Sequence, residues 1–265
     1  MVQHLMDHLE WREAQGESAG MTTNAIDQRG KMIASDSRWS ISAGNLVFYV
    51  DDTGFDKIAD RAEGSLICAG DAGLIQRWRD WFMLPVPMAI MRPPTEDTVN
   101  GQPVRIAITV LQKPDASALF SKGEYLMYED FAFFSGSGAQ YARDCFSANG
   151  CSKRAVASAG QEDPLTGGET KFVELATNAN NLSAQTATAQ EAYAQLLQRG
   201  SVMDTATKKV VPIQDAATAN ASAVRAVQGG QLPLSAPSGK PIAPWSEKER
   251  KDLDAALAKL FAKQA

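Results

Sequence analysis

Hydrophobic and polar residues alternate in short segments between residues 21 and 176, and the period changes repeatedly between that of a strand and that of a helix. The strand-like segments are bounded by glycine, proline and aspartate, as strands joined by tight turns usually are. The predicted strands are residues 22–27, 31–36, 45–50, 64–69, 104–112, 119–122, 125–128, 132–135 and 171–175. Gly30 lies in the turn that joins the first two.

Three other segments have the period of a helix. They are residues 71–82, 139–148 and 152–161. In the first of them, Leu74, Ile75, Trp78 and Phe82 share one face. Helices set between pairs of strands favour sheets in the middle and helices outside, which is an α/β layered sandwich.

The two ends of the chain differ from this middle region. Residues 1–21 hold a short amphipathic pattern and a flexible QGESAG segment, and are interpreted as a leader or propeptide. Residues 177–244 are rich in small and polar residues, so we expect a low-complexity, partly disordered extension. Residues 245–265 predict a helix with a capping box at Ser246 and Glu249. Its apolar stripe from Leu253 to Phe261 is expected to dock on the same chain.

Composition narrows the classes of function. With 44% hydrophobic and 22% charged residues and a net charge of −5, the chain resembles an ordinary globular protein without a basic patch for nucleic acid or anionic membranes. No segment is long and apolar enough to cross a bilayer. Three cysteines, Cys68, Cys145 and Cys151, indicate reduced thiols and a cytoplasmic location. Both histidines, His4 and His8, lie near the start, which argues against a serine–histidine triad or a histidine-based metal site in the core, and no cofactor is expected.

Four spaced segments carry a resemblance. They are residues 21–23 and 34–38 (MTT, ASDSR), 57–58 and 66–73 (KI, LICAGDAG), 133–142 (FFSGSGAQYA) and 163–168 (DPLTGG). In order and approximate spacing, over residues 22–176, they resemble the proteasome β-subunit family, and most of all its bacterial HslV-type members. The resemblance implies a four-layer αββα sandwich of the N-terminal-nucleophile hydrolases, and the activity of a threonine peptidase.

The resemblance assigns the central chemistry to three residues. Thr22 is the implied nucleophile, and its α-amine, once it is the true N-terminus, is the general base. Such an amine has a pKa near ~8, so a useful fraction is neutral at neutral pH, and no histidine is needed. By resemblance, Lys57 places a positive charge beside Thr22, and Asp36 holds that lysine by a charge-assisted hydrogen bond.

Four further residues complete the implied site. The backbone N–H of Gly70 is the implied donor to the oxyanion. Ser137 and Asp163 are implied to steady the threonine amine through hydrogen bonds. Thr166 lies where the family usually has a small hydroxyl residue and is implied to support the same network.

Two features depart from the family. Thr22 and Asp36 are about two residues closer in sequence than their counterparts, but an even shortening of a hairpin keeps both side chains on their faces. Met21 stands between Gly20 and Thr22, whereas self-cleaving family members have glycine directly before the threonine. We therefore expect either translation from Met21 or removal of residues 1–21 by another route. Without that, Thr22 carries an amide and the mechanism fails.

Each motif also has an ordinary structural interpretation. Asp71 is a plausible helix cap after a strand, and Gly70 is a residue that relieves strain there. The segment SGSG fits either the tight start of a helix or an anion-binding loop. A lysine such as Lys57 is usually solvated, residues 163–168 fit a simple turn, and Cys68 fits a core thiol. These interpretations do not predict four segments in one family's order.

The predicted partners follow from the preferred function. A peptide or an unfolded protein is the expected substrate, and by resemblance the chain assembles into a homo-oligomeric ring that an ATP-dependent unfoldase serves. Two alternatives remain open. One is an amidase of the same nucleophile class that acts on a small molecule, and the other is a non-catalytic scaffold or assembly protein whose threonine is never exposed.

Overall fold

Two antiparallel sheets lie face to face in the computed structural model, which describes residues 22–87, 89–216, 221–237 and 240–262. The smaller sheet has five strands in the order β10-β11-β1-β2-β12. Their bounds are Leu126–Tyr128 (β10), Ala132–Gly136 (β11), Thr23–Asp27 (β1), Met32–Ser35 (β2) and Lys171–Glu174 (β12). The hairpin of β1 and β2 therefore lies at the centre of this sheet.

The larger sheet has ten strands, of which eight follow the order β14-β13-β4-β3-β15-β6-β8-β7. Two others pair at its side, β5 with β6 and β9 with β8. The bounds are Trp39–Ala43 (β3), Leu46–Val50 (β4), Ile58–Asp60 (β5), Gly64–Asp71 (β6), Glu96–Val99 (β7), Gln102–Gln112 (β8), Ala118–Lys122 (β9), Ser201–Asp204 (β13), Val210–Pro212 (β14) and Ser235–Ala236 (β15). Strands from both halves of the chain therefore share this sheet.

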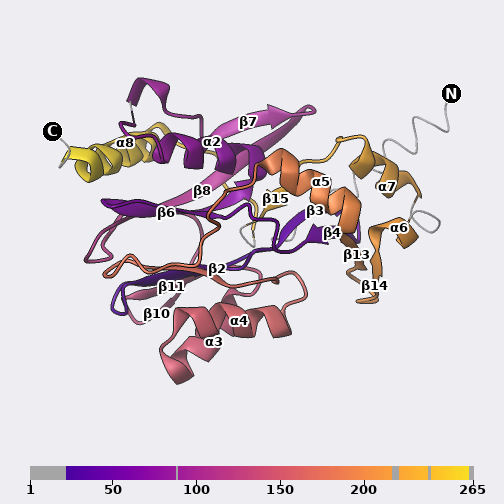
Figure 1. Ribbon diagram of the computed structural model, residues 1–265, viewed down its shortest axis with the longest axis horizontal. Helices are drawn as coiled ribbons and strands as arrows, with labels where there is room; N and C mark the ends of the chain where they lie inside the picture. Colours follow the sequence, from indigo (N-terminus) through magenta and orange to yellow (C-terminus); the bar gives the residue numbers. More distant parts are fainter. Residues whose placement is uncertain (1–21, 88, 217–220, 238–239, 263–265) are drawn as a thin grey trace.

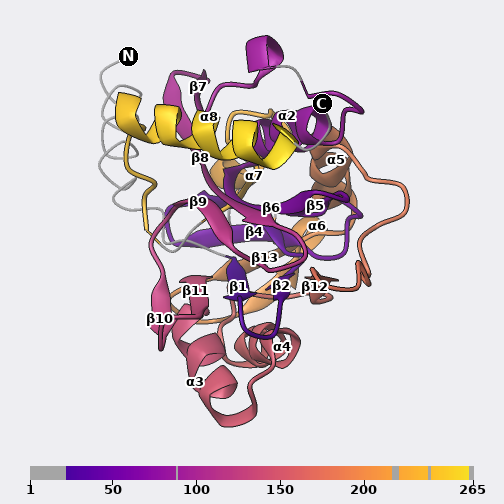
Figure 2. The ribbon, with the colours of Figure 1, turned by 90° about the vertical axis from the view of Figure 1, so that its left-hand side faces the viewer.

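Helices cover the outer faces of the two sheets. In Figures 1 and 2, α3 and α4 lie beyond the smaller sheet, while α2 and α8 lie on the far side of the larger one. The helices are Ala72–Phe82 (α2), Ala139–Asn149 (α3), Ser152–Glu162 (α4), Ala189–Arg199 (α5), Ile213–Ala216 (α6), Ala221–Gln228 (α7) and Glu247–Phe261 (α8), with a 3₁₀ turn at Ala89–Met91. The predicted mixed α/β class is confirmed.

Burial on both faces explains why the central strands are apolar or small throughout. On one face of the smaller sheet, Ala25 and Phe134 pack with α3 and α4. On the other face, Ile26 and Ile33 meet Ile67 of the larger sheet. Alternate residues of β1 therefore belong to two different cores, and neither face is left for solvent.

The predicted elements of residues 22–176 match the structure closely at most positions. Each of the three helices ends within one residue of its predicted bounds, and Asp71 caps α2 by accepting a hydrogen bond from the N–H of Leu74 at 2.8 Å. Strands β3, β5 and β7 were missed. β7 is polar at three of its four positions (EDTV), β5 has three residues, and β3 (WSISA) carries two serines. Short or polar strands give a weak alternation, so tertiary pairing decides them.

The expectation of a loosely packed, low-complexity extension over residues 177–244 is wrong for its described part. β13 pairs with β4 along four residue pairs, and α5 packs against β4. Leu196 and Val227 are fully buried in the main core. The composition misled because asparagine, glutamine, serine and threonine lower the mean hydropathy and alanine adds little apolar surface. A few well-spaced apolar residues with small neighbours nevertheless suffice to join a core that already exists.

The C-terminal helix docks on its own chain, as predicted. Ser246 and Glu249 form the capping box, and Leu253, Leu257 and Leu260 are buried. Phe261 lies against the rings of Trp81 and Phe82 in α2, with ring centroids 6.0 and 5.8 Å apart.

Some expectations fall elsewhere. The amphipathic pattern and the leader lie within residues 1–21, outside the described residues. In the part of the chain that is described, no helix has the length and apolar character to span a bilayer.

Replacement of a core leucine in α5 tests whether this C-terminal region is structural. Leu196→Ala should lower the free energy of unfolding by about 2–5 kcal/mol, because a fully buried side chain leaves a cavity. Its neighbour Leu197, which is only partly buried, provides the matched control and should lose less. Urea unfolding followed by circular dichroism measures both. Equal and small losses in the two variants would contradict the assignment of α5 to the core.

Candidate active site

The central hairpin of the smaller sheet brings Thr22 and Asp36 together. Asn24 pairs with Ser35, so Thr22, just before β1, and Asp36, just after β2, lie at the same end of the hairpin. The N–H of Asp36 donates to the carbonyl of Thr23 at 3.1 Å. Thr22 Oγ1 donates to Asp36 Oδ1 at 2.5 Å. The shortened hairpin therefore keeps the contact that was expected of it.

Lys57 reaches this pair from the larger sheet. It directly precedes β5, which pairs with β6. Its Nζ donates to Asp36 Oδ1 at 2.8 Å and also donates to Thr22 Oγ1. Thr22, Asp36 and Lys57 are 0%, 2% and 1% exposed in the chain, so the cluster is closed to water between the two sheets. Lysine is rarely buried to this extent unless it is paired.

Burial and a directly bonded counter-ion are the main influences on the charge of Lys57. Desolvation lowers the pKa of Lys57, and the neighbouring Asp36 carboxylate opposes that shift. Asp36 in turn accepts from the N–H groups of Thr23 (2.9 Å), Arg38 (3.2 Å) and Gly167 (3.3 Å). Several donors on one carboxylate spread its negative charge and hold it in position. The ammonium group is thereby directed at the hydroxyl of Thr22.

A second hydrogen-bonded chain lies beside the first. Asp163 Oδ2 accepts from Ser137 Oγ at 2.5 Å and from Thr166 Oγ1 at 2.6 Å. Thr166 Oγ1 is also 2.7 Å from Thr23 Oγ1, and because its only proton goes to the carboxylate, Thr23 is the donor there. Asp163 Oδ1 also accepts from the N–H of Leu165 at 3.0 Å. Among the described residues, no hydrogen bond of the Ser137 or Asp163 side chain goes to Thr22, whose nitrogen is a peptide amide in this chain.

Two glycines explain how the threonines approach the SGSG segment. Gly136 has φ +99°, and a Cβ there would lie 1.4 Å from the carbonyl oxygen of Thr22. At Gly138 a Cβ would lie 2.3 Å from Thr23 Oγ1 and 2.8 Å from Thr166 Oγ1. Any side chain at either position would push the threonines away. Gly138 also caps α3, so the tight start of a helix and the close approach are served by one segment.

Gly70 is not hydrogen-bonded to this cluster among the described residues. It is in β6 with φ +116°, where a Cβ would lie 2.2 Å from the carbonyl oxygen of Arg105. Its neighbours across the sheet are Ile106 in β8 and Ala236 in β15. Within the described residues Gly70 makes no hydrogen bond to Thr22, Asp36 or Lys57. Its implied role as an oxyanion donor stays a prediction.

Arg38 was not assigned a role in advance, although it joins the hairpin to the turn of residues 163–168. Its guanidinium makes two 2.8 Å bonds to Asp51 and one of 2.5 Å to the carbonyl of Pro164. A Cβ on Gly167 would lie 2.3 Å from Arg38, so the glycine makes room for it. The arginine of the ASDSR segment was the available signal. Its long-range partners could not be read from the sequence.

Cys68 is a core thiol and not part of the cluster. It is fully buried, and desolvation raises its pKa to about 12, so the thiol stays neutral. The described residues hold no group of three or more histidine, cysteine or acidic side chains placed to bind a metal ion.

No protein-family model matches the chain, and no curated protein sequence matches it.

Removal of one charge tests the buried pair. Asp36→Asn leaves the Lys57 ammonium without its counter-ion and should cost about 3–5 kcal/mol of the free energy of unfolding. Asp36→Asn combined with Lys57→Met removes both charges and should recover most of that loss. The exposed pair Lys248–Asp252 supplies the control, since Asp252→Asn should cost under about 1 kcal/mol.

The Asp36→Asn variant should also respond to pH. Burial lowers the pKa of Lys57 in the folded state, so the unfolded chain binds the proton more tightly. Stability must then rise with pH between the lowered folded pKa and the ordinary value near ~10.4. Denaturant unfolding at several pH values measures this. A variant whose stability falls or stays flat over that range would contradict the buried, uncompensated ammonium.

Proposed function

We propose that the chain is a threonine peptidase of the proteasome β-subunit and HslV type, which cleaves peptide bonds through an acyl-enzyme on Thr22. The observation that carries this proposal is the position of Thr22 Oγ1, in contact with both the Lys57 ammonium and the Asp36 carboxylate inside a buried cluster. Two facing sheets with helices on both outer sides support the further proposal of a four-layer αββα sandwich of the N-terminal-nucleophile hydrolases.

The proposed reaction requires Thr22 to be the first residue. Either residues 1–21 are removed by cleavage, or translation starts at Met21 and that methionine is removed. The free amine of Thr22 takes the hydroxyl proton, directly or through water, as Oγ1 attacks the substrate carbonyl. The Lys57 ammonium stabilises the negative charge that develops on Oγ1, because it already donates to that atom. The tetrahedral intermediate collapses to an ester on Thr22, and the leaving amine takes the proton back. Water then hydrolyses the ester and restores the threonine.

Asp36 and the second chain have positioning roles in this proposal. Asp36 keeps Lys57 charged and directed at Oγ1. Ser137, Asp163 and Thr166 hold the peptide that follows Thr22, through the hydroxyl of Thr23. A new amine on Thr22 would be free to turn toward that chain. Peptides or unfolded proteins are the proposed substrates, and a homo-oligomeric ring served by an ATP-dependent unfoldase is the proposed setting.

A non-catalytic scaffold is the second candidate. The full burial of Thr22 in the 265-residue chain favours it, since a nucleophile that is 0% exposed cannot meet a substrate. The two candidates differ in what happens when Thr22 becomes the N-terminus.

Hydrolysis of unfolded casein by a chain that starts at Met21, and loses that methionine, tests the proposal. Thr22→Val replaces the hydroxyl with a methyl group and should lower the rate of hydrolysis roughly a thousandfold or more. Thr95→Val is the matched control, because among the described residues Thr95 is buried and its Oγ1 has no hydrogen-bond partner. It should leave activity intact. Equal hydrolysis by Thr22→Val and the wild type would exclude Thr22 as the nucleophile, and release of ammonia from small amides without cleavage of casein would favour an amidase.

A further inference from the structure

A strand of two residues fills a gap in the middle of the larger sheet. β15 lies between β3 and β6, with Ser235 opposite both Ser40 and Asp71, and Ala236 opposite Gly70. The N–H of Ala72 donates to the carbonyl of Leu234 at 2.9 Å. Among the described strands, β3 and β6 do not pair with each other, so the sheet is continuous there only through β15. Without these residues, a slot one strand wide separates β3 from β6.

This slot borders the Thr22 cluster. β3 begins at Trp39, three residues after Asp36, and the Trp39 ring lies 5.6 Å from Lys57 Nζ. On the other side of the slot, β6 contains Gly70, and the chain that follows β15 passes over this glycine. A Cβ on Gly70 would lie 3.0 Å from Ile242 Cδ1. The segment around β15 therefore covers Gly70, the implied oxyanion donor of the proposed site.

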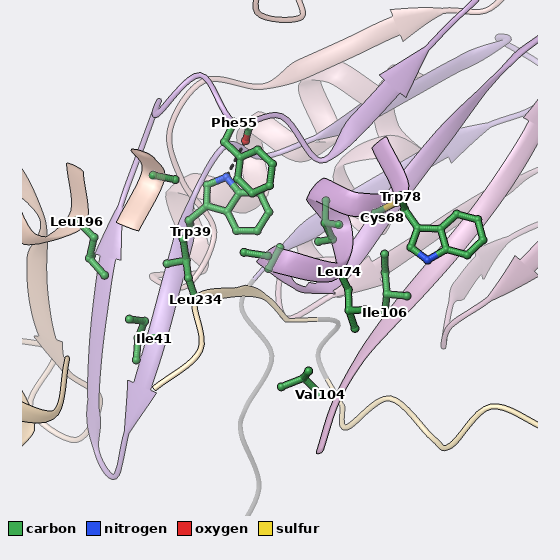
Figure 3. Packing of buried hydrophobic residues seen from close by; sticks show 14 of the residues in the cluster. Trp39, Ile41, Phe55, Cys68, Leu74, Trp78, Val104, Ile106, Leu196 and Leu234 are labelled. Atoms are coloured by element: carbon green, nitrogen blue, oxygen red, sulfur yellow. Dashed lines mark hydrogen bonds between the residues drawn. The ribbon is translucent and has the colours of Figure 1, made fainter. Parts of the chain in front are cut away.

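The occupant of the slot is held by its backbone and by alternate side chains. Leu234 and Ala236 are 5% and 0% exposed and belong to the main core, whereas Ser235 between them is partly exposed. Figure 3 shows Leu234 beside Trp39, whose indole N–H donates to the carbonyl of Phe55. Main-chain pairing of this kind tolerates many sequences, and pockets for alternate side chains select among them.

We propose that the slot between β3 and β6 is a binding site for an extended peptide, and that β15 is an internal strand that occupies it until such a peptide displaces it. The proposal rests on the proposed function, because it makes β15 an intramolecular inhibitor of the Thr22 site. The preferred peptide carries a large apolar residue where Leu234 lies and a small residue two positions later. A strand of two residues has few hydrogen bonds to lose, so local opening of β15 costs less than global unfolding.

Peptide binding to the full 265-residue chain tests the exchange. The probe is a fluorescein-labelled synthetic peptide with the sequence of residues 231–237 (QLPLSAP), and the readout is fluorescence anisotropy. Leu234→Asn weakens the internal strand and should tighten binding of the probe at least tenfold. Leu232→Asn is the matched control. Leu232 is equally buried at 5%, but it lies two residues before Leu234, which adjoins β15 and accepts from the N–H of Ala72, so this variant should leave binding at the wild-type level.

A disulfide provides a second test that does not depend on the leucine variant. Ser40 and Ser235 are direct cross-strand partners, whose Cα spacing suits a disulfide. In Ser40→Cys combined with Ser235→Cys, the oxidised protein should not bind the probe, and reduction should restore binding. Equal binding by wild type, Leu234→Asn and Leu232→Asn, or by the oxidised and reduced forms, would overturn the proposal. If Leu234→Asn fails to fold, the comparison of oxidised and reduced forms decides alone.

Casein hydrolysis by the oxidised and reduced forms of the same double-cysteine variant, in a chain that starts at Met21 and loses that methionine, separates this inference from the proposed function. If the oxidised and reduced states hydrolyse casein at equal rates, the proposed peptidase activity stands and β15 is not an internal inhibitor. If reduction of the disulfide restores probe binding but neither form hydrolyses casein, the slot is a peptide-binding site and the proposed peptidase activity is wrong.

Discussion

The contact of the Lys57 ammonium with Asp36 and Thr22 is the constraint on which the site depends. Both charged groups are at least 98% removed from water, given exposures of 1% and 2%, so each is stable there only because the other is present. The pair also joins the two sheets, since Asp36 follows β2 and Lys57 precedes β5. A charge pair of this kind contributes little net stability compared with an apolar pair, and its presence fits the proposed chemical role of the hydroxyl that it touches.

Glycine at defined positions makes the contact possible. Gly136 and Gly138 let the backbone of Thr22 and the side chain of Thr23 approach the start of α3, and Gly167 leaves room for Arg38. The N–H of Gly167 then reaches the Asp36 carboxylate. Backbone and side-chain restraints therefore converge on Thr22 from the hairpin, from the SGSG segment and from the turn of residues 163–168. Such convergence fixes a hydroxyl more firmly than one hydrogen bond does.

Most helices and strands of residues 22–176 can be predicted from the sequence, because strong local signals mark them. The helix of α2 has an apolar face and an aspartate cap, and the shortened β1–β2 hairpin keeps Thr22 against Asp36. The contact of Lys57 with this pair came from resemblance to a family, since nothing local marks a lysine for burial. The C-terminal region was misjudged because its strands have partners far away in sequence: β13 pairs with β4, and β15 with β3 and β6. Pairing over such separations leaves little trace in composition or periodicity.

Thr22 can act as a base only with a free amine, so the chemical state of its nitrogen is the central point. The most direct test is intact mass and N-terminal sequencing of protein purified from the full 265-residue chain. We predict a start at Thr22. A protein that begins at Met1 or Val2, and that retains this N-terminus while it hydrolyses peptides, would contradict it.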